Sequence, residues 1–128
     1  MRVLLVQDNA DLGAIWKRFL KRHGIHAHLA TTQAEAIDAL ENTHFDALVL
    51  ELVLPDGGGI AVADFAAYKS PEIPVIAVTK SSFFSDGSIF EVVPNARCLM
   101  RTPVRPDDLV AYLEHCAEKQ PEREAQFA

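Results

Sequence analysis

Apolar, strand-like segments alternate with segments of helical periodicity along the whole chain, and this alternation restricts the fold more than any other feature. The strand-like segments are residues 2–6, 25–30, 45–50, 73–78 and 97–100. The helical patterns are residues 11–23, 32–41, 60–68 and 88–93, with a last one that starts at Pro106. Strands joined by helical crossovers form a parallel sheet, because the crossover is nearly always right-handed. The sequence therefore predicts an α/β fold.

Five strand-helix units define the expected architecture in more detail. It is a flavodoxin-like (βα)5 three-layer sandwich, with a parallel five-stranded sheet of order 2-1-3-4-5 and helices on both faces. A chain of 128 residues is one domain of ordinary size. We expect residues 1–118 to form this domain, and the charged residues 119–128, which include Pro121, to form a C-terminal tail or linker.

Composition and charge exclude several classes of protein. Eighteen acidic residues against 12 Lys and Arg give a net charge of −6, which argues against a broad nucleic-acid surface, because phosphate binding needs clustered positive charge. No apolar run approaches the roughly 18 residues of a membrane span. A secretory signal is not recognisable, and Cys98 and Cys116 are the two cysteines. We expect a cytoplasmic protein that contacts neither nucleic acid nor membrane directly.

The residues that end the strands are the candidate functional residues. In parallel α/β sheets, ligands bind beyond the carboxyl ends of the strands, where the strand order reverses. The polar residues at these ends are Gln7, Asp8 and Asn9, residues 51–53, Thr79 and Lys80, and residues 101–103.

Four motifs at the strand ends carry a resemblance to a known family. They are VLLVQDN, FDALVLELVLPDGGG, IPVIAVT and TPVRPDDL, in this order and at matching separations. With them the chain resembles the receiver domain of bacterial two-component response regulators, the CheY-like family, from Arg2 to about Glu118. In that family an acidic pair ends strand 1, an aspartate that accepts a phosphoryl group ends strand 3, a Thr or Ser ends strand 4, and a Lys before a Pro ends strand 5.

Three of these five positions are replaced in this chain. The equivalents are Gln7 and Asp8 for the acidic pair, Glu51 for the acceptor, Thr79 for the hydroxyl, and Thr102 for the lysine. A shift of strand 5 by one residue would put Arg101 at the lysine position instead. The resemblance also implies a conformational switch, in which the hydroxyl residue moves together with a strand 5 aromatic. That second position holds Leu99, or Cys98 in the shifted register.

The replacements argue against ordinary phosphorylation. The family's Mg²⁺ site falls on Asp8, Glu51 and Val53, and Mg²⁺ demands near-ideal octahedral geometry. Glu51 carries one methylene more than aspartate, and a misplacement of about 1 Å can slow a reaction about a hundredfold. Without the lysine the site also lacks a fixed cation for phosphate charge. We expect Mg²⁺ binding to be weak or absent, and no other cofactor.

Two basic residues are candidates to replace the missing charge. We expect the cationic group of Lys80 or Arg101 to lie within about 4 Å of a carboxylate of Asp8 or Glu51, because crowded like charges would otherwise raise one another's pKa. The proline that follows the family's lysine is preceded by a cis bond, so we also expect a cis bond between Thr102 and Pro103.

The resemblance implies a signalling module, not an enzyme. We expect a receiver-like domain that works without phosphorylation and binds a protein partner such as a histidine kinase or an output domain. A homodimer through the face built from helix 4, strand 5 and helix 5 is a further candidate. Glu51 would then hold one state of the switch, since its longer side chain partly imitates a phosphorylated aspartate.

Other interpretations stay open beside this one. The first is a working receiver that retains Mg²⁺, and the second is a small flavodoxin-like enzyme. The acidic stretch at residues 7–11 disfavours a flavin phosphate. A metal site at His23, His26 and His28 is disfavoured because no Cys or acidic ligand lies at suitable spacing, and residues 57–59 lack the Lys and Ser or Thr of a P-loop.

Overall fold

The chain folds into alternating strands and helices. The computed structural model describes the backbone of residues 1–80 and 86–127 and the side chains of residues 1–80 and 88–117. The elements are β1 (Arg2–Val6), α1 (Ala10–Arg22), β2 (His26–Ala30), α2 (Gln33–Asn42), β3 (Ala47–Glu51), β4 (Val53–Leu54), β5 (Gly57–Gly58), α3 (Gly59–Lys69), β6 (Val75–Thr79), α4 (Asp86–Val92), β7 (Ala96–Arg101) and α5 (Pro106–Phe127).

The main sheet has five strands in the order β2-β1-β3-β6-β7. Every pairing in it is parallel, so the predicted order 2-1-3-4-5 is confirmed. The short strands β4 and β5 form a separate antiparallel pair, where the sequence indicated only a turn. This hairpin follows the carboxyl end of β3 directly.

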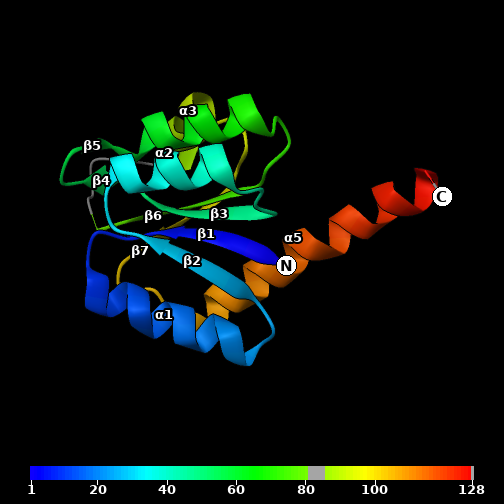
Figure 1. Cartoon of the computed structure of the whole chain (residues 1–128), viewed down its shortest axis with the longest axis horizontal. Coiled ribbons are helices and arrows are strands. Elements are labelled where there is room, and N and C mark those ends of the chain that lie inside the picture. The colour runs from blue at the N-terminus through cyan, green and yellow to red at the C-terminus, as the bar shows by residue number, and fades with distance from the viewer. Residues whose placement is uncertain (81–85, 128) are drawn as a thin grey trace.

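Helices cover both faces of the sheet (Figure 1). On one face, α2, α3 and α4 close a core that includes Leu48, Leu50 and Ile89. On the other face, α1 and α5 close a second core that includes Trp16 and Leu113. All five residues of β3 and all five of β6 are buried, which explains why these strands read as continuous apolar runs.

Side-chain hydrogen bonds fix where α1 and α2 begin. Oδ1 of Asn9 accepts the N–H of Leu12, and Oγ1 of Thr32 accepts the N–H of Glu35. Asp56, in the β4–β5 hairpin, accepts the N–H groups of Gln33 and Ala34 at 2.7 and 3.1 Å. These bonds satisfy donors that a helix start leaves open, and they tie the hairpin to α2.

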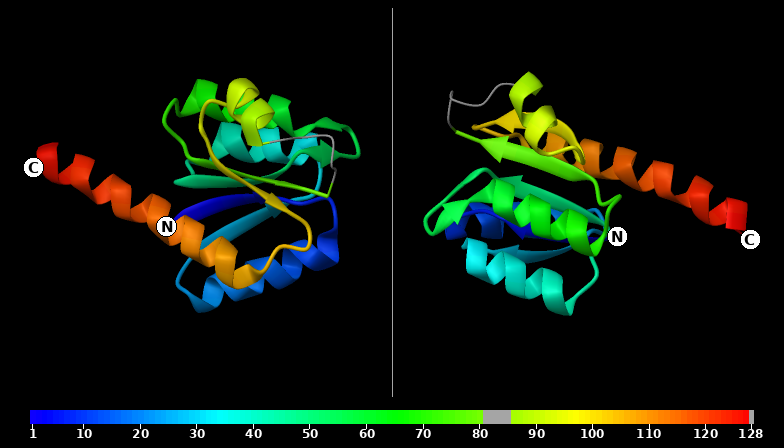
Figure 2. Two further views of the ribbon diagram at one scale, coloured as in Figure 1. Left: turned by 180° about the vertical axis from the view of Figure 1, so that it is seen from behind. Right: turned by 90° about the horizontal axis from the view of Figure 1, so that it is seen from above.

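The C-terminal segment is helical. Residues 119–127, predicted as a tail or linker, continue α5, which projects beyond the body of the domain (Figures 1 and 2). The segment is rich in Glu, Lys, Gln and Ala, which favour helix and extend one that is already nucleated. Pro121 lies within α5. Within the described part of the chain, no helix has the length and hydropathy to cross a membrane.

Candidate functional site

Four strands bring the predicted site residues to one edge of the sheet. Gln7 and Asp8 directly follow β1, while Glu51, Thr79 and Arg101 end β3, β6 and β7. Glu51 is the register partner of Val78, and Thr79 is the partner of Arg101. The side chains selected from the sequence therefore gather where the carboxyl ends of the strands meet.

Glu51 lies in the interior at this edge. The residue is only 2 % exposed, and the N–H of Val53 donates to its Oε2 over a long 3.4 Å. Burial raises the pKa of Glu51 above its ordinary value, because the charged form loses its hydration. Asp8 raises this pKa further, while the charge of Lys80 lowers it. The acceptor position thus holds a carboxylate whose ionisation is penalised.

The backbone around Glu51 depends on Gly59, the first residue of α3. The N–H of Gly59 donates to the carbonyl oxygen of Leu52 at 2.8 Å. A Cβ at Gly59 would collide with the backbone carbonyl of Glu51. The run of three glycines indicated a turn, but its sequence carries no signal for this close approach.

The acidic pair has become an amide and one carboxylate with different surroundings. Gln7 is 3 % exposed, and its Oε1 accepts the N–H of Asn9 at 3.1 Å, so its oxygen serves the start of α1. Oδ1 of Asp8 is buried and accepts no hydrogen bond from the described residues. Asp8 is therefore the less satisfied member of the pair.

Lys80 approaches Asp8 as predicted. Its Nζ lies 3.7 Å from Oδ2 of Asp8, which confirms the expected distance for one of the two candidate cations. The Lys80 side chain is 62 % exposed, so solvent screens the pair, and such ion pairs contribute about 1 kcal/mol or less to stability. The ion pair therefore matters mainly within the site, where it places a positive charge of the protein beside the carboxylates.

The remaining site residues come from β6 and β7. Thr79 is fully buried, and its carbonyl oxygen accepts the N–H of Thr102 at 3.0 Å. The bond between Thr102 and Pro103 is cis, as predicted. Arg101 is exposed at the end of β7.

The two alternatives for the strand 5 switch position face opposite layers. Leu99 packs against the core that contains Ile89 and Val93, next to α4. Cys98 packs in the core of α1 and α5. Leu99 is therefore the residue that shares a layer with α4.

The donor set fits Mg²⁺ poorly. Of the residues that the resemblance implies, Asp8 and Glu51 offer carboxylates and Val53 a backbone carbonyl. The pKa of Glu51 is raised, and the ammonium of Lys80 stands 3.7 Å from Asp8, where it repels a second cation. The oxygen of Gln7 is engaged by the N–H of Asn9. Mg²⁺ is usually held by one or two carboxylates together with waters, and here burial disfavours the charged form of Glu51 while Lys80 competes for Asp8. No cluster of three His, Cys, Asp or Glu suited to a metal occurs in the described residues.

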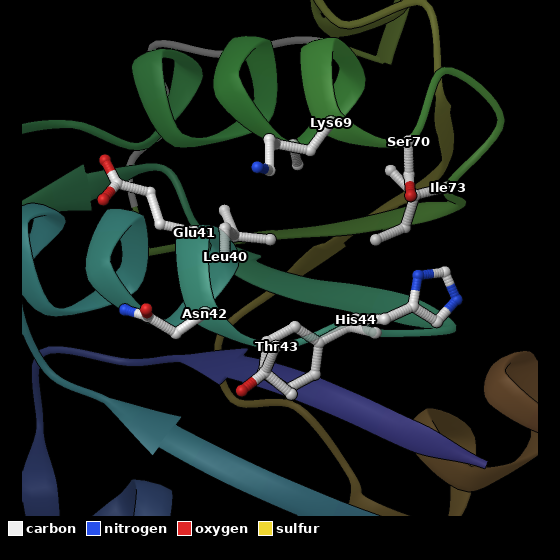
Figure 3. A pocket seen from close by; sticks show the side chains of 10 residues that line it. Leu40, Glu41, Asn42, Thr43, His44, Lys69, Ser70 and Ile73 are labelled. Carbon is white, nitrogen blue, oxygen red and sulfur yellow. The ribbon is translucent and has the colours of Figure 1, made fainter.

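A hollow of about 230 Å³ lies at the opposite end of the sheet (Figure 3). It lies between the C-terminal ends of α2 and α3, and its lining includes Glu41, His44 and Lys69. Because it opens at the amino ends of the strands, it takes no part in the strand-end site.

One contributor to the site region was missed at the sequence level. Asp56 joins the hairpin after β3 to the start of α2, and hydrogen bonds from Gln33 and Ala34 hold its pKa below the ordinary value. An aspartate in a glycine-rich turn signals the turn itself. Its partners lie more than 20 positions earlier in the chain, so no local pattern identifies them.

Comparison with known proteins gives a consistent family. The model of the response regulator receiver domain matches residues 3–114. Regulatory protein LuxO of Vibrio vulnificus is 32 % identical over 75 residues, which are 59 % of this chain and 17 % of LuxO. The chain thus spans about a sixth of the length of this curated relative.

Solved structures agree in fold. A CheY-like response regulator receiver domain protein from Methanospirillum hungatei superposes with a TM-score of 0.84 at 27 % identity, covering 94 % of this chain and 97 % of the other. The signal receiver domain of a putative LuxO repressor from Vibrio parahaemolyticus gives a TM-score of 0.86 at 23 % identity, with coverages of 99 % and 97 %.

Proposed function

The chain belongs to the response regulator receiver domain family, and on that premise we propose that it is an atypical receiver that signals without being phosphorylated. In this proposal the domain does not catalyse a reaction. It presents one fixed conformation to a protein partner.

One observation carries this proposal, the state of the acceptor position. Glu51 is 2 % exposed, so a phosphoryl donor reaches its oxygens poorly, and the burial that raises its pKa disfavours the charged form that must act as nucleophile or metal ligand. Lys80, 3.7 Å from Asp8, supplies a cation from the protein itself. The carboxylates and Lys80 together make a charge arrangement that needs neither metal nor phosphoryl group.

Glu51 and Lys80 are proposed to hold the switch in one state. A receiver changes shape because the phosphoryl group interacts differently with two conformations. Here the longer carboxylate of Glu51 would take the place of that group permanently, with Thr79 and Leu99 fixed accordingly. Thr102, at the lysine position, adds no charge to the site.

The partner surface that we favour is formed by α4, β7 and α5. Phe90 and Val92 of α4 and Tyr112 of α5 are large side chains that remain exposed. Exposed apolar side chains of this kind mark surfaces for protein association. A histidine kinase, an output domain or a second copy of the chain would fit such a surface, and no contact with nucleic acid is required of the domain itself.

A working receiver is the second candidate, and one observation favours it. Oδ1 of Asp8 is buried and accepts no hydrogen bond from the described residues, so it offers an acceptor to a bound cation. Under this alternative, Mg²⁺ would displace Lys80 and phosphorylation would reach Glu51.

Amide spectra distinguish the two candidates. Proton-nitrogen NMR spectra of the ¹⁵N-labelled protein are recorded alone, with Mg²⁺, and with Mg²⁺ and acetyl phosphate. We expect the amides of residues 51–53, Thr79 and Leu99 to keep their positions. Shifts of these amides that require both additions would replace the proposal with the working receiver. A Lys80→Ala variant serves as the matched control, because it removes the cation beside Asp8 and keeps both carboxylates, with the pKa of Glu51 raised further by the loss of that charge.

A further inference from the structure

A basic hollow lies along the outer edge of β2, far from the strand-end site. Its volume is about 300 Å³, and its lining includes Arg2, Lys17, His26, His28 and Phe45. The chain carries a net charge of −6, so a gathering of cationic and ionisable nitrogen groups departs from the rest of the molecule. Such a site attracts a negatively charged ligand.

Strand register explains why these groups meet. Arg2 of β1 is the direct partner of His26 in β2, and His28 follows two residues later on the same face. Lys17 comes from α1, on the other side of the sheet edge. Like charges directly opposite one another in a sheet are destabilising. A bound anion would offset the positive charge that Arg2 and Lys17 bring to this hollow.

A carboxylate next to these residues, that of Asp46, binds other groups. Oδ2 of Asp46 accepts the backbone N–H of Arg2 at 2.7 Å, and its Oδ1 lies 3.9 Å from Nε2 of His44. Arg2 lines the hollow, while its backbone N–H is held by Asp46. Phe45 adds a buried apolar wall, with its ring centroid 6.1 Å from that of His28.

The backbone of β2 offers a second recognition element. Among the described strands β2 pairs with β1 alone and forms the edge of the sheet (Figure 1). The N–H of His26 donates to Met1 and the carbonyl of Ala30 accepts from Gln7, so residues 26, 28 and 30 direct their backbone groups toward β1. Alternate residues of a strand point the other way. Ala27 and Leu29 therefore direct their N–H and C=O groups outward, at the hollow's edge.

We propose that the β2 edge binds an extended, acidic segment of a partner protein as an added strand. The partner's main chain would pair with Ala27 and Leu29, and its Asp or Glu side chains would reach Arg2, Lys17 and the two histidines. Edge-strand addition takes its affinity from main-chain hydrogen bonds and its specificity from side-chain contacts. This inference is independent of how the strand-end site works, because the two sites share no residue.

A synthetic peptide tests the proposal on the full chain. The probe is a capped heptapeptide that alternates threonine and glutamate, and the control peptide has glutamine in place of glutamate. NMR titration of the ¹⁵N-labelled protein should show saturable shifts at the amides of Ala27 and Leu29 with the glutamate peptide. The glutamine peptide should bind about tenfold more weakly.

Matched charge variants distinguish binding at this hollow from non-specific electrostatic attraction between the protein and the acidic peptide. Arg2→Gln with Lys17→Gln should weaken binding of the glutamate peptide about tenfold. Lys21→Gln with Arg22→Gln removes the same charge from exposed positions of α1 outside the hollow and should leave affinity unchanged. Equal weakening by both pairs, or no binding by the wild type at millimolar peptide, would overturn the proposal.

Inorganic phosphate is the remaining arm of the experiment. If phosphate binds as tightly as the peptide and the amides of Ala27 and Leu29 do not move with either ligand, the hollow is a small-anion site and the added-strand proposal is wrong. If phosphate fails to compete with the peptide at equal concentration, the main-chain part of the proposal is supported.

Discussion

Replacing Glu51 with glutamine should stabilise the protein at neutral and higher pH. The substitution keeps nearly the same size and removes the charge from a side chain that is 2 % exposed. Glu51 accepts backbone hydrogen bonds from Leu52 and Val53, the latter 3.4 Å long and outside the usual range for N–H donors, and burial still raises its pKa above the ordinary value. The wild-type carboxylate is therefore an unfavourable charge in the folded state.

The magnitude follows from this burial. An inadequately satisfied buried polar group costs about 1 to 3 kcal/mol, and more when it is charged. Loss of the attraction between Glu51 and Lys80 opposes part of the gain. We expect Glu51→Gln to raise the free energy of unfolding at pH 8 by about 1 to 2 kcal/mol.

The stability gained by Glu51→Gln should increase with pH. The folded pKa of Glu51 is raised, so the folded state holds its proton to higher pH than the unfolded state does. The wild type therefore begins to lose stability above about pH 4.3, where Glu51 ionises in the unfolded state. The loss is complete once the pH has passed the folded pKa of Glu51. Wild type and Glu51→Gln should have similar stabilities at pH 4 and differ fully at pH 8.

Urea unfolding followed by fluorescence of the buried Trp16 measures these free energies. Glu35→Gln is the matched control, because hydrogen bonds from Thr31 lower the pKa of Glu35. The Glu35→Gln variant should be less stable than the wild type at neutral pH, and this difference should disappear as pH falls through the folded pKa of Glu35. A Glu51→Gln variant less stable than wild type at pH 8, or a gain that is the same at every pH, would refute the reasoning.

Three further predictions concern the same edge of the sheet. Gly59→Ala should lower the free energy of unfolding, measured in urea, by about 1 to 3 kcal/mol, because its Cβ collides with the carbonyl of Glu51. Gly58→Ala is the control and should change stability much less, since a Cβ there meets nothing nearer than 3.9 Å. Asp56→Asn should lower the free energy of unfolding at neutral pH, because backbone donors lower the pKa of Asp56 and so favour its charged form in the folded state. The difference from the wild type should vanish in acid, and an equal loss of stability at pH 3 and pH 7 would contradict this. Mg²⁺-dependent phosphorylation should return in a triple variant that carries Gln7→Asp, Glu51→Asp and Thr102→Lys. Glu51→Asp alone should not restore it, because residues of one catalytic unit act non-additively. Phosphorylation of the single variant would show that the other two replacements matter little.

The sequence was most informative where local patterns decide the structure. Continuous apolar runs correctly predicted the buried strands, and the helical pattern of residues 32–41 predicted α2. The strand-end residues could also be selected, because a parallel sheet brings its carboxyl ends together. The approach of Lys80 to Asp8 followed from the same reasoning.

Contacts between distant segments could not be predicted in this way. His26 and His28 were visible as alternating residues of a strand, but Arg2 joins them only through the pairing of β1 with β2. The bonds from Asp56 to α2 depend on where the hairpin folds back. Residues 119–127 were assigned to a tail because of their charge and Pro121, whereas an already formed helix extends through them.

The central claim is that this receiver functions without a phosphoryl group, and the intact mass of the wild-type protein tests it most directly. The full chain is incubated with Mg²⁺ and acetyl phosphate and analysed by mass spectrometry, beside the Gln7→Asp, Glu51→Asp, Thr102→Lys variant as a control for the donor. Our account predicts an unchanged wild-type mass and a gain of one phosphoryl group in the triple variant. A wild-type protein that gains one phosphoryl group in a Mg²⁺-dependent manner would contradict it.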